Sequence, residues 1–227
     1  MNFASMIARC AASALLGLGI SFAATAAPTT LSYALTDNVS GLGTGPYGTI
    51  TLTQFTNYVS FTVTPDSGFA FANTGGPHYE FAFNTSSAFD NAAVTVTGSA
   101  ANYFSVVSGS GLTAAAYGSF DHAIDFKSNV GGGLSGKMTA PLTFNVSKAG
   151  ITLNDFVANT NGVYFVADLG NLGSGKTGNA ISNGTLLATR GDTSDQTGSA
   201  NGKVPEPAPL ALIALALFGM AAVRRKA

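Results

Sequence analysis

Hydrophobic and polar residues alternate with a period of two over much of this chain. Because successive side chains of a strand point to opposite faces, the alternation predicts half-buried β-strands. Aromatic and β-branched residues fill the runs, and Gly, Asn, Pro and Ser separate them. The runs cover residues 49–53, 58–64, 79–83, 93–97, 103–107, 120–126, 142–146 and 163–169. Short strands at this spacing predict an all-β domain, either a β-sandwich or a jelly roll.

The N-terminus has the pattern of a secretory signal peptide. Residues 1–9 carry one positive charge, residues 10–22 are mostly small and apolar, and Ala24 and Ala26 form an A-x-A cleavage site. This order predicts a signal helix that is cut after Ala26. A retained membrane helix is the less favoured alternative.

The C-terminus has the pattern of a membrane anchor. Residues 210–223 are uncharged and would span about 21 Å as a helix, enough for a thinned bilayer once Ala208, Pro209 and snorkelling arginines are added. Arg224, Arg225 and Lys226 follow, and we expect them to stop transfer on the cytoplasmic side. A buried C-terminal helix is disfavoured, because this basic triplet has no place beneath a core.

A short polar motif precedes the apolar run. It consists of Val204, Pro205, Glu206 and Pro207, and its two prolines favour an extended backbone. The motif, the Leu-rich segment, the basic end and the signal peptide together resemble the PEP-CTERM family of exported bacterial proteins. The same tail is also labelled an ice-binding protein C-terminal domain. The resemblance implies processing by an exosortase, a membrane enzyme, in bacteria that make extracellular polysaccharide.

These patterns predict four parts. They are a signal peptide at 1–26, a β-rich extracytoplasmic domain at 27–188, a polar Gly-containing spacer at 189–203 and the sorting and anchor segment at 204–227. The protein is then held in the inner membrane through its C-terminal helix before processing. Afterwards it is at the cell surface or outside the cell.

Composition excludes some functions. Lysines are few and scattered, so no basic patch for nucleic acid is expected. Cys10, the one cysteine, would leave with the signal peptide, so the mature domain would have no disulfide. We expect no cofactor.

Candidate catalytic motifs are weak. Residues 170–177 fit the P-loop pattern, but a poor helix follows them, so a hairpin loop is the better interpretation. In residues 120–126, alternation places His122 on an apolar face with Phe120, which indicates a packed histidine. Asp121 and Asp125 would lie about 13 Å apart on one strand, too far for a glycosidase pair. A catalytic pair formed by carboxylates from distant strands remains an open alternative.

Thr-x-Thr pieces occur within 49–53, 62–64 and 95–97 but form no regular repeat. Thr is common on the solvent face of strands, so these pieces give no ice-binding prediction. Two function classes remain. The first is a non-catalytic surface or matrix protein that associates with exopolysaccharide. The alternative is a secreted carbohydrate-binding module or hydrolase.

Overall fold

The computed structural model describes residues 27–38, 41–74, 78–107, 109 and 111–190. The signal peptide, most of the predicted spacer, the sorting motif and the predicted membrane segment lie outside these residues. Within the described part, no helix is long and apolar enough to cross a membrane. That part is all-β, as the alternating pattern predicts.

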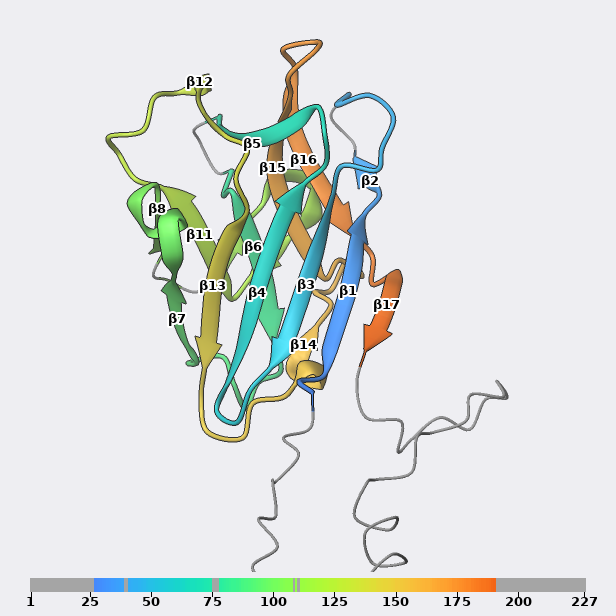
Figure 1. The fold of residues 1–227 in the computed structure, drawn as a ribbon, viewed down its shortest axis with the longest axis vertical. Helices are drawn as coiled ribbons and strands as arrows, with labels where there is room; N and C mark the ends of the chain where they lie inside the picture. Colours follow the sequence, from blue (N-terminus) through green and yellow to red (C-terminus); the bar gives the residue numbers. More distant parts are fainter. Residues whose placement is uncertain (1–26, 39–40, 75–77, 108, 110, 191–227) are drawn as a thin grey trace, which may run out of the picture. The chain divides into compact units, whose positions relative to one another are not determined.

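The strands form two main sheets (Figure 1). The first, here called sheet A, has the order β17-β1-β3-β4-β13-β7. Its strands are β1 (Thr30–Leu35), β3 (Gly48–Gln54), β4 (Tyr58–Pro65), β7 (Ala93–Val96), β13 (Leu142–Ser147) and β17 (Leu186–Arg190). All neighbouring pairs in sheet A are antiparallel.

The second sheet, sheet B, has the path β12-β5-β15-β6-β11-β8, with β16 beside β15 and β2 beside β16. Its strands are β2 (Asp37–Asn38), β5 (Phe69–Asn73), β6 (Phe81–Thr85), β8 (Phe104–Val107), β11 (His122–Phe126), β12 (Gly133–Met138), β15 (Phe165–Asn171) and β16 (Thr177–Ser182). β14 (Phe156–Val157) pairs with β6, and β9 (Leu112–Thr113) pairs with β10 (Ser119–Phe120). Three short 3₁₀ turns, η1 (Gly98–Asn102), η2 (Ala115–Tyr117) and η3 (Leu153–Asp155), lie between strands.

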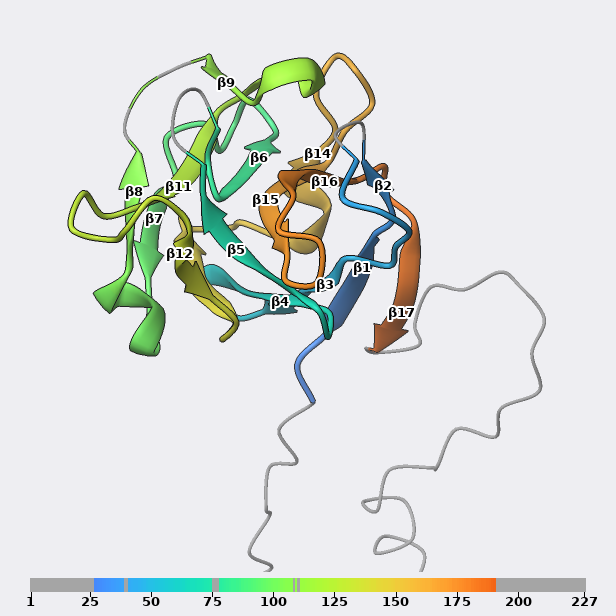
Figure 2. The ribbon, with the colours of Figure 1, turned by 90° about the horizontal axis from the view of Figure 1, so that it is seen from above.

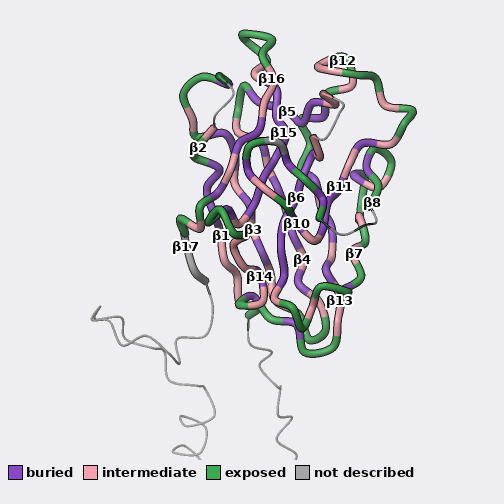
Figure 3. Tube along the Cα trace, turned by 180° about the vertical axis from the view of Figure 1, so that it is seen from behind, coloured by how far each residue is buried: buried purple, intermediate pink, exposed green. Residues whose placement is uncertain are grey.

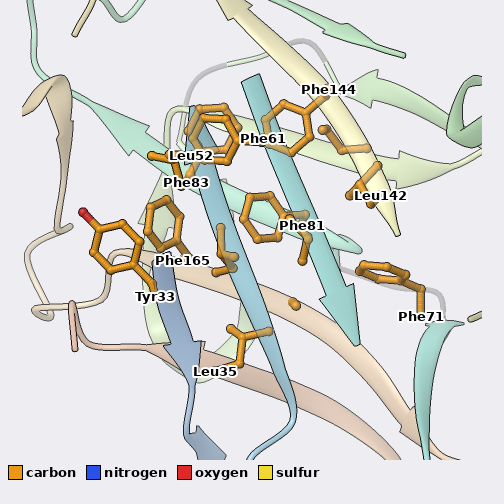
Figure 4. Packing of buried hydrophobic residues seen from close by; sticks show 14 of the residues in the cluster. Tyr33, Leu35, Leu52, Phe61, Phe71, Phe81, Phe83, Leu142, Phe144 and Phe165 are labelled. Atoms are coloured by element: carbon orange, nitrogen blue, oxygen red, sulfur yellow. The ribbon is translucent and has the colours of Figure 1, made fainter. Parts of the chain in front are cut away.

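The core fills the space between the sheets (Figures 2 and 3). Phe61 of sheet A packs on Phe144 of the same sheet and on Phe83 and Phe165 of sheet B, with ring centroids 4.6, 5.4 and 6.0 Å apart. Figure 4 shows these rings together with Phe81. Aromatic side chains bury large apolar areas, so this cluster stabilises the contact of the two sheets in a chain whose described part has no cysteine.

A smaller apolar cluster covers part of the outer face of sheet B. Ala82, Ala123 and Val166 of the sheet pack there against the segment that contains β9, η2 and β10. Figure 2 shows this segment on the side of sheet B that faces away from sheet A. Sheet B therefore has a partly covered outer face, whereas no described segment lies across the outer face of sheet A (Figure 1).

Several predicted elements differ in detail from the structure. Phe120 was expected on the same strand face as His122, but the strand breaks at Asp121 and Phe120 packs in the smaller cluster. The runs expected at 79–83 and 163–169 begin two residues later, at Phe81 and Phe165. β17 ends at Arg190, so the first two residues of the expected spacer pair with β1.

Candidate functional site

The residues predicted to direct export and sorting all lie outside the described part of the chain. They are Ala24, Ala26, Val204, Pro205, Glu206, Pro207, Arg224, Arg225 and Lys226. The described domain has three candidate features of its own: a hydroxyl-bearing sheet face, a groove at one end of the domain and a row of acidic side chains.

The outer face of sheet A is an array of hydroxyl groups, here called the hydroxyl face. Strand pairing aligns its side chains in lateral rows, and the central row is Ser32–Thr51–Thr62–Thr143. The next row is Thr30–Thr53–Ser60–Asn145–Thr95, and a shorter row is Ala34–Thr49–Thr64. The Thr-x-Thr pieces form no regular repeat along the sequence. Strand pairing nevertheless arranges their threonines in regular rows across the sheet.

Most of these hydroxyls are available to a ligand or to water. Ser32 Oγ lies 3.2 Å from Thr51 Oγ1, and Thr143 Oγ1 donates to the Thr97 carbonyl oxygen at 2.9 Å. Among the described residues, the side chains of Thr49, Thr53, Ser60, Thr62 and Thr64 make no hydrogen bond to protein. Each is partly exposed. Their donors and acceptors therefore face outward.

An aromatic pair lies at one end of the hydroxyl face, at the β3–β4 hairpin. Phe55 and Tyr58 stack with ring centroids 4.5 Å apart and an interplanar angle of 8°. By strand alternation Tyr58 points to the same face as Ser60 and Thr62. Phe55 is 38% exposed, so the pair presents an apolar ring to solvent beside the hydroxyls.

A groove of about 960 Å³ adjoins this hairpin. Phe55, Leu31, Ile151 and Leu153 line it with apolar atoms, and Gln54 lies among them. Gln54 Nε2 donates to the carbonyl oxygens of Phe55 and Ile151, at 2.6 and 2.9 Å. Its Oε1 is buried without a partner in the described structure. Buried amide oxygens are usually satisfied, so this acceptor, which has almost no accessible surface, is an unusual feature of the groove wall.

A row of polar side chains crosses the outer face of sheet B, here called the acidic row. Pairing of β11, β6, β15 and β16 places Asp125, Glu80, Asp168 and Asn179 side by side. Glu80 and Asp168 are 1% and 0% exposed. These carboxyl groups come from distant strands, and the sequence pattern alone gave no sign that they meet.

Few groups compensate the charges of the acidic row. The Phe126 N–H points to Glu80 Oε2 at 2.9 Å and to Asp125 Oδ1 at 2.7 Å. Thr74 Oγ1 donates to Asp168 Oδ2, and Asn179 Nδ2 lies 3.4 Å from His78 Nδ1. Asp168 Oδ1 and Asn179 Oδ1 are buried with no described partner.

Burial accordingly changes the acidities in the row. Burial, the hydrogen bond and negative charge of Asp125 and the charge of Asp168 together raise the pKa of Glu80 to about 10, against the opposing Phe126 N–H. Burial also raises the pKa of Asp168 to about 6, although Thr74 and the charge of His78 act in the opposite direction. Glu80 is therefore protonated at neutral pH and donates to Asp125.

His122 is a packed histidine, as its apolar neighbours predicted. Its ring stacks on Phe83 at 4.9 Å, and Nε2 lies 3.2 Å from Thr85 Oγ1. Burial lowers its pKa, against the charges of Asp121 and Asp90. The other histidine, His78, lies beside the acidic row.

The P-loop pattern is a hairpin loop, as expected. It joins β15 to β16, and Asn171 Oδ1 accepts from the N–H groups of Gly173 and Ser174 at 2.9 and 3.0 Å. Gly175 has φ of 73°, a conformation that glycine adopts without strain. The N–H groups of Gly173, Ser174, Gly175 and Lys176 are all bonded within the loop, and β16 follows instead of a helix.

The described domain presents a hydrogen-bonding surface of hydroxyl groups on the outer face of sheet A. Within the described residues, no three His, Cys, Asp or Glu side chains are placed to hold one metal ion. Glu80 and Asp168 are too deeply buried to touch a solvent-borne substrate in this structure.

Comparison with known protein families identifies a sorting motif in the C-terminal tail. The family model described as the PEP-CTERM protein-sorting motif matches residues 203–226. The chain carries a PEP-CTERM sorting motif. The motif marks an exported protein that passes through the membrane and is sorted by an exosortase. The matched residues contain the Pro205-Glu206-Pro207 sequence and the whole basic end, Arg224, Arg225 and Lys226. No curated protein and no solved structure matches the chain.

Proposed function

We propose that this protein is a non-catalytic component of the bacterial cell surface or extracellular matrix that associates with exopolysaccharide. The PEP-CTERM motif at residues 203–226 carries the proposal, because it assigns the chain to an export and sorting route. Its signal peptide, cut after Ala26, starts that route. The segment 210–223 then holds the protein in the inner membrane until the exosortase acts.

Two features of the domain support a binding role. The outer face of sheet A offers outward hydroxyls without a covering segment among the described residues, and the groove beside Phe55 combines apolar walls with the unpartnered Gln54 oxygen. Of the carboxyl groups that come closest to a catalytic arrangement, Glu80 and Asp168 are buried, and Glu80 shares its proton with the partly exposed Asp125. A glycosidase needs one carboxylate that reaches the sugar ring.

Two measurements on the exported protein, purified from the cells that make it, test the proposal. Sedimentation with exopolysaccharide isolated from the same cells should carry the protein into the pellet with the polymer. Incubation with that polymer should release no new reducing ends. Release of reducing ends that Asp125→Asn abolishes would establish the hydrolase alternative, and failure to co-sediment would remove the polysaccharide from the proposal.

A further inference from the structure

The composition of the hydroxyl face is far from that of the chain. Its three rows hold twelve side chains, of which ten are Ser or Thr. In the whole sequence 46 of 227 residues are Ser or Thr. The other two positions are Asn145 and Ala34, so these twelve positions contain no charge, and β17 continues the row of Thr30 with Arg190 at the edge of the sheet. Thr suits any solvent-facing strand, but the outer face of sheet B, built on the same kind of strands, carries the acidic row and an apolar cluster instead.

The chemistry of this surface selects a class of ligand. A hydroxyl both donates and accepts, and a row of them matches a partner whose own groups are hydroxyls. The twelve positions hold no lysine or arginine that would attract phosphate or an acidic polymer, and no carboxylate that would attract a cation; Arg190 lies beyond them, on the edge strand β17. A neutral polysaccharide meets these conditions.

The aromatic pair adds the apolar contact that sugar rings use. Phe55 and Tyr58 form a stacked pair at the hairpin end of β3 and β4, next along these strands from Thr53 and Ser60. Phe55 is the more exposed ring of the two, and it also lines the groove in which Gln54 Oε1 lacks a partner. One ligand can therefore contact hydroxyls along the face and an apolar ring at its end.

The size and shape of the face favour a flexible polymer over a crystalline surface. The face is about 19 Å wide across five strands, and from Thr49 to Phe55 it extends about 20 Å along the chain, so it accommodates several sugar units in the direction that ends at the aromatic pair. Neighbouring strands of a sheet rotate by about 20° relative to each other, so the hydroxyls follow a curved surface. A chain can bend along such a surface, whereas the rigid plane of ice would meet only part of it.

We propose that the hydroxyl face and the Phe55–Tyr58 pair together form the binding surface for a neutral polysaccharide chain. The inference rests on the proposed function and names its site. Binding consists of many weak hydrogen bonds, each contributing little alone, with the aromatic pair fixing one end of the ligand.

The test compares variants of the full exported protein. Thr51→Val, Thr53→Val and Thr62→Val, made together, remove three hydroxyls and keep the β-branched shape. Thr36→Val, Thr139→Val and Thr160→Val, made together, change three exposed threonines outside the rows and form the matched control. A separate Phe55→Ala variant removes the exposed ring. Circular dichroism and thermal unfolding confirm that each variant folds.

The probe is the neutral fraction of exopolysaccharide isolated from the same cells and separated from acidic polymer by anion exchange. We expect the face variant to bind at least about 10-fold more weakly, Phe55→Ala to bind several-fold more weakly, and the control to bind like the wild type.

Wild-type binding that the face variant retains in full would place the site elsewhere and leave the proposed function intact. Wild-type binding to the acidic fraction alone would overturn the ligand class. No wild-type binding to either fraction would overturn both proposals. Inhibition of ice growth that the face variant alone loses, without any polysaccharide binding, would assign the surface to ice.

Discussion

The main-chain N–H of Asp168 donates to the carbonyl oxygen of Glu80 at 3.1 Å. This contact between neighbouring strands places two buried carboxyl groups next to each other, with Asp125 on the far side of Glu80. Three carboxyl groups in a row repel each other when all are ionised. The fold accommodates them by retaining a proton on Glu80, which makes its stability depend on pH.

We predict that the free energy of unfolding falls as the pH rises from 6 to 8. In the unfolded chain Glu80 ionises above pH 4.5, whereas in the fold its pKa is about 10. The folded state therefore binds more protons over this range, so the stabilisation is complete below pH 4.5 and is lost as the pH rises toward 10. Because Glu80 is almost fully buried, the fall should approach about 1.4 kcal/mol per pH unit. Urea unfolding at several pH values measures it.

Glu80→Gln is the diagnostic variant for this row. Its amide keeps an acceptor for the Phe126 N–H and a donor for Asp125, so it imitates the protonated acid. We expect the variant to be more stable than the wild type at pH 8 and to lose most of the slope. Asp66→Asn, a carboxyl outside the row, should keep the slope. An unchanged slope in Glu80→Gln would show that another group holds the proton.

His122 should produce the opposite dependence on the acid side. Burial lowers its pKa, so as the pH falls the histidine of the unfolded chain binds a proton near pH 6.5, whereas the folded histidine binds one only at a lower pH. The contribution of this neutral ring to stability is complete above pH 6.5 and is lost as the pH falls through the lower folded value. We predict that wild type loses stability relative to His122→Phe between pH 6.5 and 5.

The absolute stability of His122→Phe is a separate matter. Phe keeps a ring against Phe83 but leaves the buried Thr85 hydroxyl without its partner, which should cost about 1–3 kcal/mol at pH 7.5. The pH-dependent difference between the two proteins is therefore the relevant readout. A difference that stays constant from pH 7.5 to 5 would contradict a depressed histidine pKa.

Phe61 should be the most sensitive position of the core. Its ring contacts aromatic rings on both sheets, including Phe83, Phe144 and Phe165, and it is 0% exposed. We expect Phe61→Ala to lower the free energy of unfolding by about 3–5 kcal/mol, because the rings around the cavity cannot all close it. Phe55→Ala, a phenylalanine at the surface, should cost much less. Equal losses in the two variants would contradict this assignment of the core.

The sequence pattern predicted strands best where one face is buried and the other is solvated. β3 and β4 alternate cleanly between the core and the hydroxyl face, and both were expected. β5 was missed because Phe69 to Ala72 are buried on both sides, which removes the alternation. β16 was missed for a related reason, since small and polar residues fill it. Periodicity detects contrast between two faces, not strands as such.

The candidate sites depend on strand register, which the sequence does not specify. Thr51 and Thr62 become neighbours only because β3 and β4 pair as they do, and Asp125 meets Glu80 only through the pairing of β11 with β6. The P-loop pattern and His122 were interpreted correctly, because each depends on its immediate neighbours. Local chemistry could therefore be predicted, whereas surfaces built from several strands could not.

The last prediction concerns Glu206, which lies between two prolines inside the sorting motif. Its carboxylate is costly to draw into hydrocarbon, so it should stay in the interface where the exosortase reaches it. We expect Glu206→Ala to leave export intact but to keep the protein membrane-bound and uncut. Asp195→Ala, a matched acidic change in the predicted spacer, should be processed normally. Replacing Arg224, Arg225 and Lys226 by Gln should weaken retention before cleavage.

Mass spectrometry of protein released from the cell surface measures this processing. Wild-type and Asp195→Ala material should lack peptides from residues 210–223, and Glu206→Ala should yield little released protein, with those peptides in the membrane fraction. Released wild-type protein that still contains residues 210–223 would mean that the apolar segment is a permanent anchor. In that case Glu206 would have no role in cleavage, and exopolysaccharide would be bound by a protein that stays in the membrane.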